Sequence, residues 1–225
     1  MATIQQAPSS ISILRKRPAG QGGASSAAYW RKTARGKLQR VIREHYLRPA
    51  SDFPLPPSLP SSLQWVLPDT NAILHQFDLI SSSFFPAPLL ISQTVLDEVR
   101  HRSLPLYNKL RTLVDDDFEL PNGGGAIKRG FTVWNEAMEE TFLEKNEGES
   151  PNDRNDRAIR HLASYFSSLL SSPSSNKRQK TSTSSPLRPS TSDEPLLLLT
   201  DDAANLALAQ SASLPALTIR QYVAS

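Results

Sequence analysis

The sequence predicts an α/β fold, a three-layer domain with a central parallel sheet, preceded by a basic N-terminal extension. Two patterns support this prediction. Short apolar runs alternate with amphipathic segments of helical period between residues 63 and 220, and several of these runs carry no polar side chain on either face. Strands of that kind are typical of parallel sheets that helices cover on both sides.

The expected elements follow one another along the domain. LQWVLPDTN (63–71) and APLLIS (87–92) are expected to be strands, and Ser92 is placed to cap the helix SQTVLDEVRHRS (92–103). The remaining elements alternate between helix and strand, at 107–114, 131–134, 153–170, 196–200, 202–210 and 216–220. The run LLLLT at the fourth of these strands has no polar interruption, which predicts complete burial.

The rest of the chain is not expected to form a packed core. Residues 1–28 are rich in Ser, Ala, Gly and Gln without apolar periodicity, and we expect them to be disordered. Residues 29–60 are expected to form a basic helix that ends at Pro49, followed by a stiff proline-rich linker. Within the domain at 61–225, the Ser/Thr/Pro-rich insert 171–195 is also expected to be disordered.

Charge is distributed unevenly along the chain. Residues 1–60 carry ten Lys and Arg against two acids, whereas residues 61–225 carry fifteen against twenty. A basic arm of this kind suits a polyanion or an acidic protein surface as a partner, or is a solvated tail. The chain has no cysteine, which excludes disulfides and thiolate metal sites. It also has no apolar run of the roughly 18 residues that a membrane span needs, so no membrane partner is expected.

Acidic residues follow two of the predicted strands directly. Asp69 ends the first strand, and the pair Asp201 and Asp202 follows LLLLT. The carboxyl ends of parallel strands meet at one edge of a sheet, where sites form at the point of strand-order reversal. An Asp in such a position is often only a helix cap or a turn residue. Carboxylates that converge from two strands, however, repel each other unless a cation compensates them.

Helical phase selects one acid on each of two helices. At about 100° per residue, the apolar face of TVLDEVR places Glu98 at the border of the core and Asp97 toward solvent. The same construction on the long helix at 153–170 places Asp156 at the rim of the apolar face and Asp153 toward solvent. Glu98 and Asp156 are therefore the acids that can reach a shared cleft.

Three other side chains of the long helix are expected to have structural or surface roles. Asn155 lies near the middle of the apolar stripe, so we expect its amide to be buried and hydrogen-bonded. Arg154 and Arg157 are expected on the surface, where they pair with neighbouring acids or touch phosphate.

Four acids thus come from separate elements, Asp69, Glu98, Asp156 and Asp202, with Asp201 as an alternative to the last. Oxygen ligands at this density suit Mg²⁺ or Mn²⁺, whose coordination is completed by water and a substrate phosphate. One or two such ions activate water for in-line hydrolysis of a phosphodiester. A chain without cysteine and with four histidines is less suited to zinc.

Several segments carry a resemblance to a known family. They are DTNAILHQFD (69–78), ISQTVLDEVRHRSLPLYNKLR (91–111), NDRNDRAIR (152–160) and LLTDD (198–202). Together they closely resemble the PIN domain of the catalytic exoribonuclease subunit of the eukaryotic RNA exosome, and REHYLR (43–48) is similar to the segment before that domain. The resemblance covers residues 30 to 225, apart from the insert and the tip around NGGGA.

The resemblance implies a Rossmann-like PIN fold and a metal-dependent endoribonuclease that acts on single-stranded RNA. It places the metal ligands at Asp69, Glu98, Asp156 and Asp202, and it favours Asp202 over Asp201 because the family has Asn-Asp after this threonine. It also implies RNA exosome core subunits as partners, a role in rRNA processing and RNA decay, and localisation to the nucleus, including the nucleolus, and to the cytoplasm. An alternative is that the domain mainly docks the exonuclease on the exosome core.

The chain departs from the family in two respects. The three-cysteine motif that usually follows REHYLR is replaced by the cysteine-free PASDFPLPPSLPSS (49–62), so functions of those thiolates are not expected here. The RNA-binding barrels and the exonuclease domain that follow in the family are not part of this sequence, which is expected to be a fragment or a shortened protein.

Overall fold

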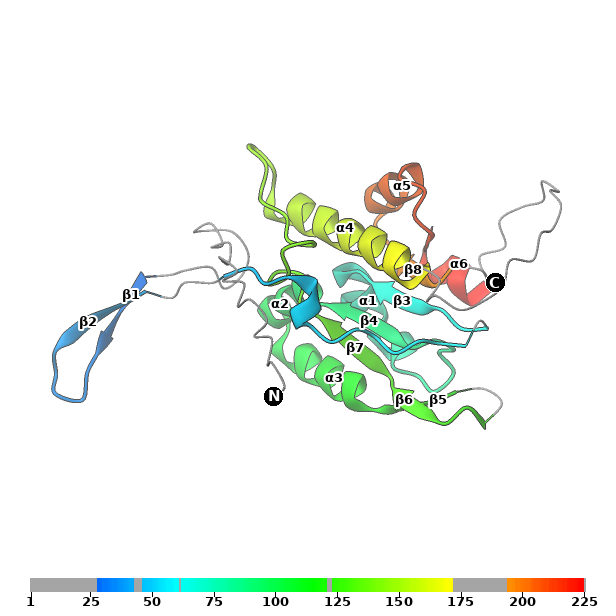
Figure 1. The fold of residues 1–225 in the computed structure, drawn as a ribbon, viewed down its shortest axis with the longest axis horizontal. Coiled ribbons are helices and arrows are strands. Elements are labelled where there is room, and N and C mark those ends of the chain that lie inside the picture. Colours follow the sequence, from blue (N-terminus) through cyan, green and yellow to red (C-terminus); the bar gives the residue numbers. More distant parts are fainter. Residues whose placement is uncertain (1–27, 43–45, 61, 121–122, 172–193, 225) are drawn as a thin grey trace, which may run out of the picture.

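The structure is a computed structural model, and it resolves a five-stranded parallel sheet with helices on both faces and two small hairpins (Figure 1). It describes residues 28–42, 46–60, 62–120, 123–171 and 194–224. The tail at 1–28 and the insert at 171–195, both expected to be disordered, lie outside the described residues except at their ends. In the part of the chain that is described, no helix is long and apolar enough to cross a membrane.

The central sheet is parallel throughout, as predicted, with the strand order β7-β4-β3-β8-β9. Its strands, in chain order, are β3 (Trp65–Pro68), β4 (Leu89–Ser92), β7 (Gly130–Val133), β8 (Leu196–Leu199) and β9 (Ala216–Leu217). Every residue of β3, β4 and β8 is buried, which agrees with their apolar composition on both faces. The chain moves outward from β3 through β4 to β7 and then returns to β8 on the other side of β3. The strand order therefore reverses between β3 and β8.

Helices cover both faces of this sheet. They are α1 (Thr70–Ile80), α2 (Gln93–Arg102), α3 (Leu104–Asp115), α4 (Pro151–Ser171), α5 (Ala203–Ser211) and α6 (Ile219–Ala224). Right-handed crossovers in opposite directions put α1, α2 and α3 on one face and α4 and α5 on the other (Figure 1). Ser92 caps α2 as predicted, because its hydroxyl accepts a hydrogen bond from the Val95 amide at 3.1 Å. Residue 219 begins α6, so the strand expected at 216–220 contains only its first two residues.

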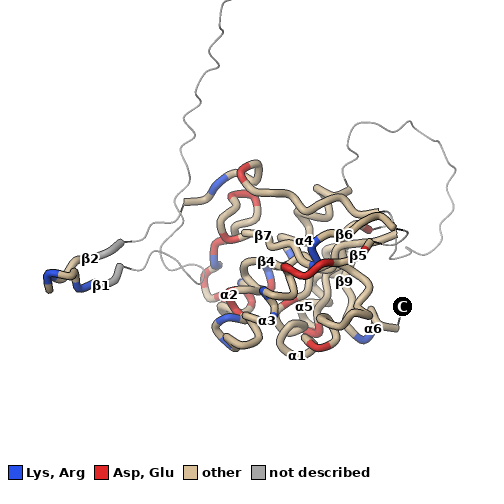
Figure 2. The backbone as a smooth tube through the Cα atoms, turned by 90° about the horizontal axis from the view of Figure 1, so that it is seen from below, with Lys and Arg blue, Asp and Glu red and all other residues tan. Residues whose placement is uncertain are grey.

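The helix expected between residues 29 and 48 was wrong. This segment forms an antiparallel hairpin of β1 (Ala28–Lys32) and β2 (Leu38–Ile42). The turn is closed by a hydrogen bond from the Thr33 amide to the Lys37 carbonyl at 2.8 Å, and Gly36 adopts a φ of 78° there. Aromatic and β-branched residues in both arms favour strand pairing over the helical spacing. Figure 2 shows Lys and Arg gathered on this hairpin.

A second hairpin, β5 (Asp117–Glu119) and β6 (Ala126–Lys128), was not predicted. It leads into β7, where α3 packs closely on the sheet. A Cβ atom at Gly130 would lie 2.8 Å from Cγ2 of Val114. The close approach of α3 to β7 therefore depends on the missing side chain of this glycine.

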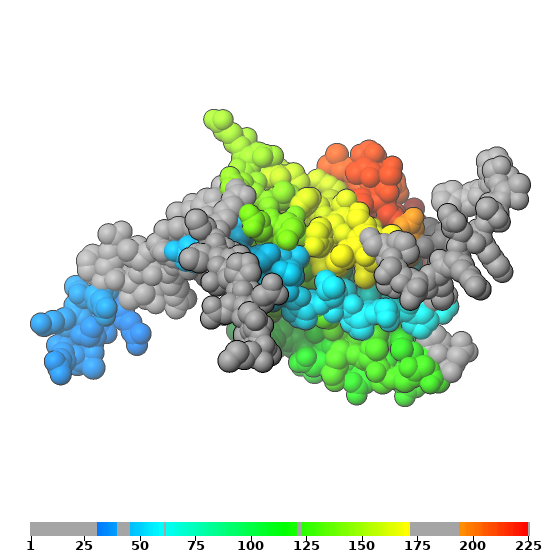
Figure 3. Space-filling view, viewed as in Figure 1, coloured from blue at the N-terminus to red at the C-terminus, as the bar shows by residue number. Residues whose placement is uncertain are grey.

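The proline-rich segment at 46–60 packs against the domain and is not a free linker. Leu47 is completely buried, and the Arg48 backbone pairs with the loop after β7. The Glu140 carboxylate accepts hydrogen bonds from the Ala50 amide at 2.8 and 2.9 Å. Figure 3 shows the segment lying on the surface between α4 and α3. The domain thus includes residues that precede its expected start.

Candidate metal-binding active site

Asp69 lies at the carboxyl end of β3 and begins α1. Its side chain is almost completely buried, and its Oδ1 accepts a hydrogen bond from the Ala72 amide at 2.6 Å. Its Oδ2 accepts a hydrogen bond from the hydroxyl of Thr200, the residue that follows β8. Asp69 is therefore both a helix cap and a carboxylate fixed at the point where the strand order reverses.

Thr200 connects the two strand ends. Besides donating to Asp69, its hydroxyl oxygen accepts a hydrogen bond from the Asp202 amide at 3.1 Å. Asp202 in turn caps α5, since its Oδ1 accepts hydrogen bonds from the amides of Ala204 and Asn205 at 2.8 and 3.0 Å. Thr200 was not selected as a site residue from the sequence. The pattern that could have indicated it is a single hydroxyl residue between an apolar strand and a pair of acids.

The neighbouring Asp201 has a different role in the structure. Its side chain is exposed, and its Oδ1 accepts a hydrogen bond from the Ile219 amide at the start of α6 at 3.2 Å. Its charge raises the pKa of Asp69, as that of Asp202 also does, after the larger effect of burial. After burial, the charge of Asp202 is the largest cause of the raised pKa of Asp156. This effect, together with the hydrogen bond of the Asp202 amide to Thr200, favours Asp202 over Asp201 at the site.

Glu98 connects three helices at the same edge. Its Oε2 accepts hydrogen bonds from the hydroxyl of Thr70 at 2.9 Å and from the side-chain amide of Asn155 at 3.4 Å, so α2 is joined to α1 and α4. Its Oε1 pairs with the guanidinium of Arg102 at 2.8 Å, one turn later on α2. The Asn155 amide is hydrogen-bonded as predicted, but the residue is half-buried rather than buried.

Asp156 lies in the second turn of α4 and is half-buried. Burial, followed by the negative charges of Asp202, Asp69 and Glu98, raises its pKa to about 6, while the charge of Arg160 opposes this rise. Burial likewise raises the pKa of Asp69 to about 6, against the hydrogen bonds that its carboxylate accepts. The charges of Asp202, Asp69 and Glu98 thus act together on Asp156, as expected for carboxylates that converge without a cation.

Arg160 is a second residue that sequence reasoning missed. It lies one turn after Asp156 on α4, half-buried, and its guanidinium donates a hydrogen bond to the side-chain oxygen of Asn205 in α5. Burial lowers its pKa, and the charges of Asp156 and Asp202 counteract this. Arg160 therefore places a positive charge beside two of the four acids.

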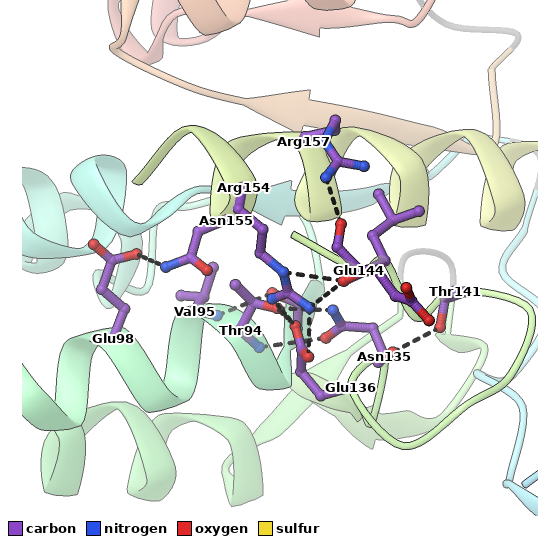
Figure 4. A network of polar contacts seen from close by, with 12 residues as sticks. Thr94, Val95, Glu98, Asn135, Glu136, Thr141, Glu144, Arg154, Asn155 and Arg157 are labelled. Atoms are coloured by element: carbon purple, nitrogen blue, oxygen red, sulfur yellow. Dashed lines mark hydrogen bonds and ion pairs between the residues drawn. The ribbon is translucent and has the colours of Figure 1, made fainter. Parts of the chain in front are cut away.

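A buried ion pair anchors the start of α4, shown in Figure 4. Arg154 is 4% exposed, which corrects the expectation that it lies on the surface. Its guanidinium forms a two-bond pair with Glu136, one bond measuring 2.8 Å, and donates to the Leu143 carbonyl at 2.7 Å. Thr94 of α2 donates its hydroxyl to Glu136 at 2.9 Å. The pair therefore joins the loop after β7, α2 and α4 into one network.

Three other predictions on these helices have mixed outcomes. Arg157 pairs with the Glu149 carboxylate at 2.7 and 2.8 Å, so it meets a neighbouring acid as expected but is half-buried. This pairing lowers the pKa of Glu149 to about 2. Asp97 is half-buried rather than directed fully to solvent, and burial followed by the charge of Glu136 raises its pKa. Asp153 is exposed, as predicted.

The donor set fits a hard divalent cation. It consists of carboxylates, and repulsion among them adds to the raised pKa of Asp156. Among the described residues, no three Asp, Glu or His side chains form a ready-made metal cluster. Both oxygens of Glu98 have partners, since Arg102 pairs with one and Thr70 donates to the other. One oxygen of Asp202 accepts no hydrogen bond from the described residues and is available to a ligand.

The two arginines of the repeat NDRNDR offer a matched test of the buried pair. We expect Arg154→Ala to lower the free energy of unfolding by about 3–5 kcal/mol, because it leaves the Glu136 charge buried without its partner. Arg157→Ala should cost much less, since its pair lies nearer the solvent. Urea denaturation followed by circular dichroism measures both losses, and equal losses would contradict the structural role of Arg154.

Comparison with known proteins identifies the fold and the family. A family model described as the PIN domain matches residues 66–220. The exosome complex exonuclease RRP44 of Homo sapiens is 31% identical over 225 residues, covering 89% of this chain and 21% of that protein. The exosome complex exonuclease dis3 of Schizosaccharomyces pombe is 30% identical over 246 residues, covering 96% of this chain and 22% of that protein.

The structural comparison agrees with the family match. The solved structure of the T. brucei RRP44 PIN domain superposes with a TM-score of 0.55 at 23% identity, covering 74% of this chain and 81% of that chain. This shows a shared fold. The chain spans about a fifth of the length of the curated relatives that it matches. Because the family model covers more than half of the sequence, the chain belongs to the PIN domain family.

Proposed function

We propose that this chain is a divalent-metal-dependent endoribonuclease that hydrolyses phosphodiester bonds of single-stranded RNA. The observation that supports it best is the electrostatic coupling of four acids from four elements. Burial and the charges of Asp202, Asp69 and Glu98 together raise the pKa of Asp156 to about 6. Membership of the PIN domain family and the names of the exonuclease relatives support a nuclease.

In this proposal Asp69, Glu98, Asp156 and Asp202 hold one or two Mg²⁺ or Mn²⁺ ions. When bound, the ion supplies Lewis acidity, which activates water for in-line attack and stabilises charge on the leaving oxygen. The hydrogen bond from Thr200 fixes the carboxylate of Asp69 for this role.

The other polar residues of the edge position the substrate and its ligands. Arg160 lies beside Asp156 and Asp202 and contacts the phosphate that is cut. Thr70 and Asn155 orient Glu98 by their hydrogen bonds. Contacts to phosphate give affinity without reading the bases, so cleavage is expected to depend weakly on sequence and to fall with rising salt.

The first test of the mechanism compares the two aspartates of the NDRNDR repeat. With a circular single-stranded RNA and Mn²⁺, Asp156→Asn should slow cleavage by about 100-fold or more, because it removes a ligand of the ion that stabilises the transition state. Asp153→Asn is the control, since Asp153 is exposed, and it should cleave at the wild-type rate. A circular substrate has no ends, so its linearisation reports endonucleolytic cutting alone. Undiminished cleavage by Asp156→Asn would remove this residue from the mechanism.

The raised pKa values predict how pH and metal act on stability. The pKa of Asp69 and of Asp156 is about 6 in the folded protein, against an ordinary value of 3.8. Between about pH 4 and pH 6 the folded protein therefore holds protons that the unfolded chain has lost, so the stability that these groups contribute falls as the pH rises through that window. Above it, both carboxylates are charged in the folded protein at a free-energy cost, and a cation that binds them restores stability.

Thermal unfolding with and without Mn²⁺ measures this linkage. We expect Mn²⁺ to raise the Tm by more at about pH 7 than at about pH 5, because protons compete with the ion at the lower pH. Asp156→Asn should reduce the shift at the higher pH, whereas Asp153→Asn should leave it unchanged. A shift of equal size at both pH values in the wild type would show that the ion binds elsewhere.

We further propose that the chain docks on RNA exosome core subunits and acts in rRNA processing and RNA decay, in the nucleus, including the nucleolus, and in the cytoplasm. The names of the relatives, which are exosome complex exonucleases, support the exosome as partner. The structural feature that favours docking is the β1–β2 hairpin, a two-stranded sheet that is separate from the central sheet. It exposes four cationic side chains, Arg31, Lys32, Arg35 and Lys37.

Charge reversal on the hairpin tests the docking proposal without disturbing the packed segment at 46–60. Replacing the four cations with Glu should lower the recovery of core exosome proteins in a pull-down, because the basic surface no longer attracts an acidic partner. Reversal at the exposed Lys109 and Arg220 is the control for net charge, and it is matched by the double reversal of Arg35 and Lys37, which replaces the same number of cations on the hairpin. Equal recovery with both variants would show that the hairpin is not the tether.

A further inference from the structure

Trp134 is an exposed aromatic residue at the same edge of the sheet as the four acids. It directly follows β7, and 46% of its surface is exposed, although both of its neighbours, Val133 and Asn135, are buried. An indole is large and apolar with one polar N–H, so it suits a contact surface that is covered when a partner binds. The carboxyl edge of a parallel sheet is also where ligands bind in this class of fold.

The indole of Trp134 forms one wall of a hollow of about 140 Å³. The other walls come from Leu96 of α2, Tyr107 and Arg111 of α3 and Thr132 of β7. β7 is the outermost strand of the sheet, so the hollow lies at the rim of the domain. Two aromatic rings and a guanidinium around a small hollow are the groups on which bases of single-stranded nucleic acid stack.

Positive charge flanks one side of this hollow. The guanidinium of Arg100 lies over the ring of Tyr107, 5.8 Å from its centroid. Arg100 is one turn beyond Leu96 on α2, so both face the same side of the helix. Both Arg100 and Arg111 are exposed, and neither forms an ion pair within the described residues. Asp115 also lines the hollow, one turn beyond Arg111 on α3. Because its negative charge repels phosphate, we expect a phosphate chain to lie on the side of Arg100.

Helix α2 separates the hollow from the four acids. Leu96 lines the hollow, whereas Glu98, two residues later, lies about 200° around the helix and reaches α1 and α4. The distance across one helix with its side chains is about 10 Å. An RNA strand that runs from the hollow to the four acids would pass over the last turn of α2. This turn carries Arg100, His101 and Arg102.

We propose that Trp134 is a stacking platform for one base of single-stranded RNA, with Arg100 and Arg111 contacting the adjacent phosphates. This subsite rests on the proposed function, because it takes RNA as the ligand and lies one helix away from the acids. Stacking uses the face that every base has, so the subsite accepts any base. It holds the strand on the far side of α2 while a phosphate reaches Asp156 and Asp202.

Binding measurements on the full chain test this subsite. The probe is a fluorescein-labelled oligouridylate, whose anisotropy is followed in EDTA so that no cleavage occurs. Trp134→Ala should weaken binding about 5- to 100-fold, the range found for the loss of one stacked base, and Trp134→Phe should retain most of the affinity. Phe84→Ala is the control, because Phe84 is 92% exposed but lies in the loop between α1 and β4, at the opposite edge of the sheet. It should bind like the wild type.

A ribose phosphate chain without bases separates stacking from charge. The wild type should bind this chain more weakly than the oligouridylate, and Trp134→Ala should bind the two alike. Wild-type affinity of Trp134→Ala for the oligouridylate would overturn the proposal. So would an equal loss of affinity for both probes, or a loss of exosome core recovery with RNA binding intact, which would make this surface a protein contact.

The outcome is distinguishable from failure of the nuclease proposal. If the wild type cleaves circular RNA and Trp134→Ala binds RNA normally, the stacking platform alone is wrong. If the wild type cleaves no RNA but Trp134→Ala loses base-dependent binding, the subsite stands and the endonuclease does not. Circular dichroism of Trp134→Ala and Trp134→Phe confirms that both variants are folded.

Discussion

The buried ion pair between Glu136 and Arg154 is the interaction on which the candidate site depends. Two charges removed from water stabilise a fold only when their hydrogen bonds are satisfied, and here Leu143 and Thr94 supply the additional partners. The pair fixes the first turns of α4 against α2 and the end of β7. Asp156, two residues after Arg154, is thereby held on the side of α4 that faces the other acids.

The ion pair supports a neighbouring region in which carboxylates of like charge lie together. Four carboxylates repel one another at the carboxyl edge of the sheet, and each is held by bonds that also serve the fold. Asp202 caps α5 through one oxygen and its other oxygen accepts no hydrogen bond from the described residues, whereas Asp69 caps α1 through one oxygen and accepts a hydrogen bond from Thr200 at the other. The protein accepts electrostatic strain at this edge, as expected where carboxylates are arranged to bind a cation and a phosphate.

The sequence predicts the features that depend on local pattern. The alternation of strands and helices, the acids after β3 and β8, and the phases of Glu98 and Asp156 follow from periodicity. Features that depend on partners distant in the sequence could not be predicted in this way. Arg154 is buried because it pairs with Glu136, and Thr200 belongs to the site because Asp69 ends the neighbouring strand of the sheet. The β1–β2 hairpin was mistaken for a helix because its apolar spacing suits both structures, and a glycine turn decides between them.

The central claim is that the four acids together bind a divalent cation, and anomalous diffraction from a crystal soaked in Mn²⁺ tests it most directly. The account predicts a peak at the carboxyl edge between β3 and β8, within ligand distance of Asp69, Asp156 and Asp202, at roughly 2.0–2.2 Å from carboxylate oxygen. Glu98 should turn from Arg102 toward the ion or reach it through water. A peak beside Asp97 and Glu136 instead, or no peak at all, would contradict the account.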